Sequence, residues 1–86
     1  PTGALNVINQ SGSTFTVVTI SECSAASHGF TRLDSGETIR SGGSRSWTVS
    51  QGCYDVQAGF PSSGGYTASD DRIHIRAGPQ YNLTIR

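Results

Sequence analysis

The chain has 86 residues, of which 34% are hydrophobic and 14% are charged, and its formal net charge at pH 7 is zero. A chain of this length builds one small core, so residues 1–86 are expected to form a single domain. The balanced charge argues against a nucleic-acid partner, which needs a basic surface. No apolar run is long enough to span a membrane as a helix, so no membrane insertion is expected.

The composition favours strands and turns over helices. The chain has 11 glycines and many Ser and Thr residues, and it lacks Met and Lys, so few residues stabilise a helix. We therefore expect an all-β domain, a small antiparallel β-sandwich of about seven strands that is immunoglobulin-like or similar. A closed barrel is the alternative.

Two runs of alternating apolar and polar residues, 4–9 and 13–21, open the chain. Gly12 suits the left-handed position of a three-residue turn between them. The pattern predicts a hairpin in which Val7 lies opposite Phe15.

A second hairpin is predicted at Gln51-Gly52, where two more alternating runs meet. A two-residue turn there would place Trp47 opposite Val56 on an apolar face. This segment holds the single tryptophan and one of the two cysteines, so the core is expected to pass through it.

The last two alternating runs, residues 71–77 and 81–86, are predicted to pair across a wide connection. In that register Ile75 would meet Leu83, and Arg72 would lie opposite Arg86. The like charges of this last pair would need an anion or a neighbouring acid between them.

The middle of the chain lacks a regular alternation of apolar and polar residues. Residues 21–31 are expected to form a long surface loop that is pinned by Cys23 and anchored by Phe30. Residues 34–37 and 41–44 are rich in Gly and Ser or carry Asp, and they are predicted to be turns.

The two cysteines, Cys23 and Cys53, are predicted to form a disulfide. A small chain without Lys and rich in Ser, Thr and Gly suits an oxidising compartment better than the cytosol. A secreted, periplasmic or extracellular location is therefore expected.

Three apolar residues, Ile8, Val18 and Ile20, fall on the opposite face of the first predicted hairpin. A bulge near Val17 would turn Val18 and Ile20 into the core. The alternative is that the three residues form a face that binds a partner.

Arg72, His74 and Arg76 alternate along one predicted strand, and Arg86 would lie next to them. Alternate strand residues are about 7 Å apart, and guanidinium groups match sulfate, phosphate and carboxylate. The four residues are a candidate anion or ligand face, with a solvated face neutralised by neighbouring acids as the alternative.

A second candidate is a binding loop in which Phe60 and Tyr66 flank a Gly- and Ser-rich tip that could stack on a sugar or a peptide. Phe60 also continues a core-facing pattern, which is the alternative. His28 and His74 lack the companions of a metal site, and no catalytic motif is found, so we expect no metal, no cofactor and no enzyme activity.

The order of patterns LNVINQSGSTFTVVTIS, LDSGETIRSGGSRSWTV and GCYDVQA is similar to that of small secreted bacterial β-sandwich modules. Two segments depart from the pattern of that family. Residues 9–12 read NQSG, and residues 41–44 read SGGS in place of the family's usual Pro-Gly. The resemblance implies a β-sandwich and carries no established activity.

These features together suggest a non-catalytic module that binds another protein, as an accessory part of a secreted or cell-envelope assembly. Two alternatives are a carbohydrate-binding module that uses Phe60 and Tyr66, and a small extracellular hydrolase inhibitor that presents the loop around Cys23.

Overall fold

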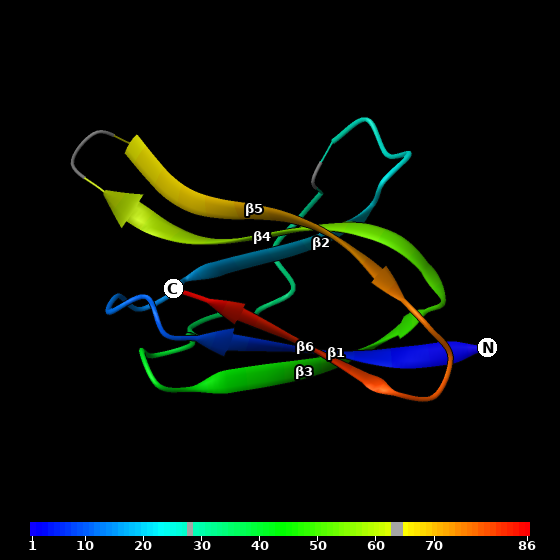
Figure 1. Cartoon of the computed structure of the whole chain (residues 1–86). Helices are drawn as coiled ribbons and strands as arrows, with labels where there is room; N and C mark the ends of the chain where they lie inside the picture. Colours follow the sequence, from blue (N-terminus) through cyan, green and yellow to red (C-terminus); the bar gives the residue numbers. More distant parts are fainter. Residues whose placement is uncertain (28, 63–64) are drawn as a thin grey trace.

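The fold is all-β and sandwich-like, with two three-stranded sheets (Figure 1). The described residues form six strands instead of the predicted seven or so, and one of the strand pairs is parallel. The computed structural model describes residues 1–27, 29–62 and 65–86, and the side chains of these residues outside 61–70. The strands are β1 (Thr2–Asn9), β2 (Val17–Glu22), β3 (Ser44–Ser50), β4 (Gly52–Ser62), β5 (Gly65–Ile75) and β6 (Gln80–Ile85). Their order is β3-β1-β6 in one sheet and β2-β4-β5 in the other. The described residues include no helix that could cross a membrane.

The first predicted hairpin is wrong, because β1 and β2 belong to different sheets. β1 is the centre of its sheet: Leu5 pairs with Trp47 of antiparallel β3 and with Tyr81 of β6, which runs parallel to β1. Val7 and Phe15 are both buried, but they meet in the core and are not cross-strand neighbours. An alternating pattern fits either arrangement, since both place every second residue on one side of the chain.

The second predicted hairpin is also wrong, although its apolar face is real. Residues 44–50 pair with β1, and β4 pairs antiparallel with both β2 and β5. Gln51 therefore lies where the chain crosses between the sheets, and its N–H donates to the carbonyl of Pro1 at 3.1 Å. Trp47 and Val56 approach the core from opposite sheets.

The third predicted hairpin fails in the same way. β5 pairs with β4, while β6 crosses to the other sheet and pairs with β1. The connection between them is held by Gly78, whose N–H donates to the carbonyl of Thr2 at 3.2 Å. Arg72 consequently lies opposite Asp55 rather than Arg86, which removes the conflict between like charges.

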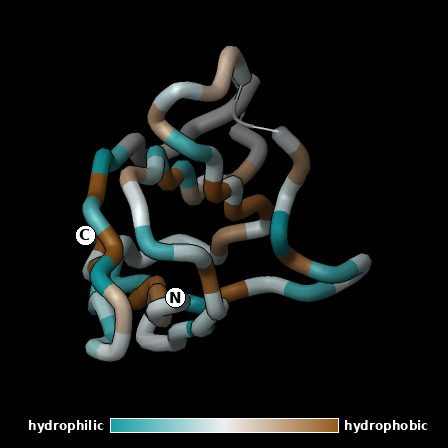
Figure 2. Tube along the Cα trace, turned by 90° about the vertical axis from the view of Figure 1, so that its right-hand side faces the viewer, coloured by the Kyte–Doolittle hydropathy of each residue, from teal (hydrophilic) through white to brown (hydrophobic). Residues whose placement is uncertain are grey.

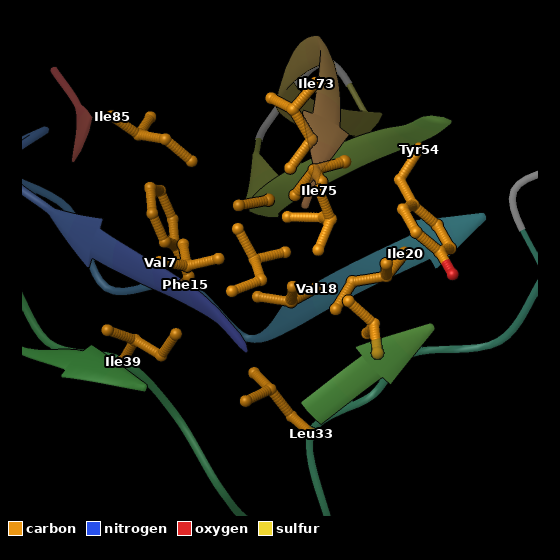
Figure 3. Close-up of a cluster of buried hydrophobic side chains, with 14 residues drawn as sticks. Val7, Phe15, Val18, Ile20, Leu33, Ile39, Tyr54, Ile73, Ile75 and Ile85 are labelled. Atoms are coloured by element: carbon orange, nitrogen blue, oxygen red, sulfur yellow. The ribbon is translucent and has the colours of Figure 1, made fainter. Parts of the chain in front are cut away.

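The core lies between the two sheets (Figure 3). Along most of the trace, hydrophobic and hydrophilic residues alternate within a few positions, as the colours in Figure 2 show. The buried apolar residues are Leu5, Val7, Phe15, Val18, Ile20, Leu33, Ile39, Val49, Tyr54, Val56, Ala58, Ile73, Ile75 and Ile85.

Val18 and Ile20 are part of this core, with 0% and 3% of their surfaces exposed. The prediction that they form a partner-binding face with Ile8 is therefore wrong for these two residues. The first interpretation is confirmed in its outcome, since both residues turn into the core. The alternation shifts between Phe15, which forms a bridge with Ile39, and Val18 of β2.

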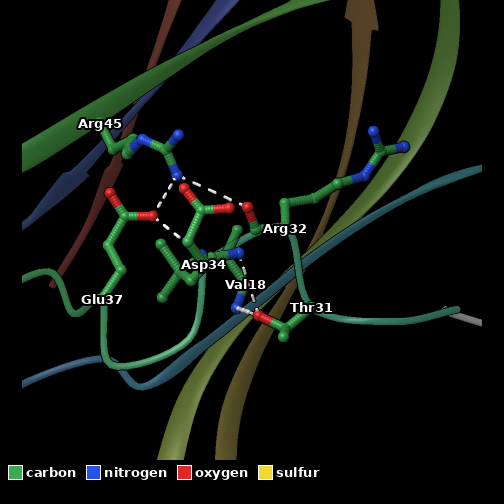
Figure 4. A network of polar contacts seen from close by, with 7 residues as sticks. Val18, Thr31, Arg32, Asp34, Glu37 and Arg45 are labelled. Atoms are coloured by element: carbon green, nitrogen blue, oxygen red, sulfur yellow. Dashed lines mark hydrogen bonds and ion pairs between the residues drawn. The ribbon is translucent and has the colours of Figure 1, made fainter.

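The long connection between β2 and β3 makes polar contacts with both of these strands (Figure 4). Thr31 Oγ1 accepts a hydrogen bond from the Val18 N–H at 3.1 Å, and Leu33 inserts into the core. Glu37 pairs with Arg45 of β3 and accepts the Asp34 N–H, which closes the predicted turn at residues 34–37.

The other predicted turn, at residues 41–44, is confirmed by a hydrogen bond from Gly43 N–H to the carbonyl of Arg40 at 2.8 Å. Phe30, in contrast, does not anchor the loop at residues 21–31. Its side chain is 94% exposed, so that loop is held by Cys23 and by the contacts that follow it.

Candidate ligand-binding groove

The predicted cationic strand at residues 71–77 corresponds to the last part of β5, which ends at Ile75, so Arg76 lies one residue beyond the strand. Ile73 and Ile75 point into the core, and Arg72, His74 and Arg76 are exposed on the opposite side of the chain. This arrangement follows directly from the period of two in a strand. Three of the four residues of the predicted anion face are thereby brought together.

A groove of about 370 Å³ opens beside these residues, between the end of β5 and the start of β6. We call it the β5–β6 groove. It is lined by Arg72, Ile73, His74, Arg76, Pro79, Gln80 and Tyr81. The tight crossing at residues 76–79 forms its closed end, since this connection joins the two strands.

Arg72 is the cation of the groove whose charge is already compensated. Its Nε and a terminal guanidinium nitrogen donate to the two carboxylate oxygens of Asp55 at 2.9 and 3.2 Å. The neighbouring acid that compensates Arg72 is Asp55, which cross-strand pairing with β4 places opposite it. Such a bidentate pair fixes the guanidinium plane at the rim of the groove.

Arg76 supplies the remaining permanent positive charge of the groove, and His74 places an imidazole beside it. Their side chains have no hydrogen-bond or ion-pair partner within the described part of the chain. The guanidinium group of Arg76 is charged, and the imidazole of His74 can donate a hydrogen bond from its ring N–H. The groove is therefore equipped to hold an anionic group.

Tyr81 adds an aromatic surface that the sequence pattern did not reveal. It is in register with Leu5, so it lies on the core-facing side of β6, yet 38% of it is exposed. The apolar alternation of β6 predicts a buried residue here. The exposure could not be predicted because it depends on which strand covers this side of the sandwich. Beside it, the Gln80 amide donates to Asn82 at 2.8 Å.

The disulfide predicted between Cys23 and Cys53 is present, with a Cα–Cα distance of 5.4 Å. It joins the end of β2 to the start of β4, where the Cys23 N–H also donates to the carbonyl of Cys53 at 3.1 Å. Cys53 pairs across the sheet with His74. The covalent link therefore stabilises the part of the sheet that carries the groove.

The other predicted site residues lie elsewhere. Arg86 follows the far end of β6, about 20 Å along the strand from Gln80, and takes no part in the groove. Phe60 is half-buried against the core, as the alternative for the predicted binding loop proposed. The side chain of Tyr66 lies outside the described residues, and so does His28.

Ile8 is half-buried on the outer side of β1, between the residues that pair with it from β3 and β6. Among the described residues, no group of three or more His, Cys, Asp or Glu side chains is placed to hold a metal ion. No protein-family model matches the sequence, and no curated protein and no solved structure matches the chain.

Proposed function

We propose that this chain is a non-catalytic binding module that holds an acidic segment of a partner protein in the β5–β6 groove. The observation that carries the proposal is the convergence of Arg76, His74 and the exposed ring of Tyr81 on one groove. A guanidinium group binds a carboxylate through two parallel hydrogen bonds, and an aromatic ring beside it gives the contact apolar area.

The compartment that we propose is extracellular or periplasmic. The disulfide between Cys23 and Cys53 supports it, because such bonds persist mainly in oxidising surroundings. An accessory role in a secreted or envelope assembly is in keeping with a binding surface on a small, cross-linked scaffold.

Binding to immobilised poly-L-glutamate at low ionic strength tests this function. Arg76→Gln removes the cation without a described structural partner, so we expect it to weaken binding about threefold to tenfold while leaving the unfolding midpoint unchanged. Arg86→Gln is the matched control, since it removes the same charge away from the groove. Equal losses in the two variants would mean that only net charge matters, and the assignment of the groove would be wrong.

A carbohydrate ligand is the second candidate, and the exposed Tyr81 ring beside the Gln80 amide favours it. Polygalacturonate combines flat sugar rings with carboxylates, so it serves as the second immobilised ligand in the same assay. Tighter binding of this polymer than of polyglutamate, lost in a Tyr81→Ala variant, would favour the glycan over the acidic peptide.

A further inference from the structure

The two sides of the sandwich between the sheets are covered differently. On the side of β2 and β3, the connection at residues 23–43 inserts Leu33 and Ile39 into the core. The same connection runs along the outer edge of β2, where the Arg32 N–H donates to the carbonyl of Val18 and Thr31 Oγ1 accepts the Val18 N–H. That side is closed by the chain itself.

On the side of β5 and β6, the described part of the chain provides no such cover. Within the described residues, β5 is the outer strand of its sheet and pairs with β4 alone, and β6 is the outer strand of the other sheet and pairs with β1 alone. Tyr81 and Leu83 are in register with the fully buried Leu5 and Val7, yet Tyr81 is 38% exposed and Leu83 is half-buried. Core-facing residues of β6 are thus reached by solvent from this side.

We propose that the partner segment binds here as an extended strand that adds to the outer edge of β5, with acidic and apolar residues in alternation. This inference rests on the proposed function and names the form of its ligand. The outer edge of β5 has no strand beside it in the described structure, and the N–H and C=O groups of an edge strand form a template for another chain.

The alternation follows from the two faces of β5. Residues of an added strand that lie beside His74, and beside Arg76 just after the end of β5, share their outward face. Carboxylates at these positions therefore meet the His74 imidazole and the Arg76 guanidinium group at a cross-strand distance of about 5 Å. The residue between them lies beside Ile75 and points to the other face, the one on which Ile73 and the ring of Tyr81 line the groove. Small apolar side chains fit there because they would complete the cover of the core.

Arg72 sets the length of the acidic pattern. Its guanidinium group already holds Asp55, so a third acid at that position gains little. Two acids separated by one apolar residue form the shortest motif that the groove can recognise. The requirement for two acids at this spacing distinguishes an extended peptide ligand from a compact anion, which would need only one cationic group.

Isothermal titration with three synthetic peptides of about seven residues tests the proposal. The first alternates Asp and Val, the second has the same composition with all Asp residues in one block, and the third is the alternating peptide with N-methyl groups on every second amide. We expect the alternating peptide to bind at least about tenfold more tightly than either control, because only it can form both the ladder and the charge pairs. Arg76→Gln should weaken it about threefold to tenfold, and Arg86→Gln should leave it unchanged.

Amide hydrogen exchange provides a second readout on the same complex. Added hydrogen bonds should slow the exchange of backbone amides in β5, on the edge that faces away from β4. Equal affinity of the three peptides, or no slowing of exchange in β5, would overturn strand addition. The proposed function would still be supported if the chain binds poly-L-glutamate and the Arg76→Gln variant does not. Loss of polyglutamate binding as well would overturn both. Self-association of the free chain through β5, detected by sedimentation, would also contradict the proposal.

Discussion

Asn9 is the polar side chain on which the first turn depends. It is fully buried at the end of β1, and its amide donates to the carbonyls of Ser13 at 2.6 Å and Ile39 at 2.8 Å. Its side-chain oxygen accepts the N–H and the hydroxyl of Ser11 at 3.0 and 2.7 Å. A buried amide that is satisfied in this way joins the turn to the bridge between Phe15 and Ile39.

Asn9→Ala should lower the free energy of unfolding by roughly 2 to 3 kcal/mol, because it leaves buried donors and acceptors unsatisfied. Chemical denaturation with the disulfide intact measures the loss. Asn6→Ala is the control on the same strand: Asn6 makes exposed hydrogen bonds to Ser46 and Asn82, so a loss below about 1 kcal/mol is expected. Similar losses in both variants would contradict the central role of Asn9.

The alternating sequence patterns predicted most of the strands but not which strands pair with each other. The segments around Val7, Val18, Val56, Ile75 and Ile85 are strands whose apolar side faces the core, as expected. Each predicted hairpin instead crosses between the sheets. Alternation specifies which side of a strand is buried. The same pattern arises in two paired strands and in two strands that face each other across a core, so it does not identify the pairing partner.

In the candidate site too, the exposed side of the strand could be predicted and its neighbours could not. The exposure of Arg72 and His74 on β5, and of Arg76 just after it, follows from the period of two, and the sequence predicted it. Their neighbours could not be predicted, because Asp55 and Tyr81 approach through pairing with β4 and through the crossing to β6. Arg86 was included only because β6 was expected to pair with β5.

Gly3 determines how closely the end of β5 approaches β1. A Cβ atom at this position would lie 2.4 Å from the carbonyl oxygen of Arg76 and 2.7 Å from Cγ2 of Ile75. Real Cβ atoms do not come this close, and the Arg76 oxygen belongs to the backbone, so it cannot turn away as a side chain could. The close contact between β1 and β5 therefore requires glycine.

Gly3→Ala should destabilise the fold by about 1 to 3 kcal/mol, since it forces the two strands apart. It should also weaken polyglutamate binding, because Arg76 moves with its backbone. Thr2→Ala, at an exposed neighbouring position, is the control and should change neither quantity measurably. An unfolding midpoint for Gly3→Ala equal to that of the unmodified chain would show that the strands are not packed this closely.

For the whole molecule, the disulfide links a long irregular connection to the sheet that carries the groove. Cys23 and Cys53 are separated by 30 positions, and the loop that they close contains Leu33 and Ile39, which complete the core. A domain of 86 residues buries only a modest share of its surface, so a cross-link that restricts the unfolded chain has a large effect on its stability.

Replacing both cysteines by Ala should lower the free energy of unfolding by about 3.5 kcal/mol, the loop-closure value for a cross-link of this span. Thermal unfolding followed by circular dichroism measures the change. Reduction and alkylation of the unmodified chain should give a similar loss. A midpoint that neither treatment lowers would contradict a stabilising role for this bond.

Ligands are expected to bind to the β5–β6 groove and not to the exposed Phe30 or to Phe60. Nuclear magnetic resonance titration of the isotope-labelled chain with a short glutamate peptide tests it most directly. We expect chemical-shift changes concentrated at residues 72–81, and their loss in Arg76→Gln but not in Arg86→Gln. Changes centred on residues 23–31, or spread evenly over all arginines, would contradict it.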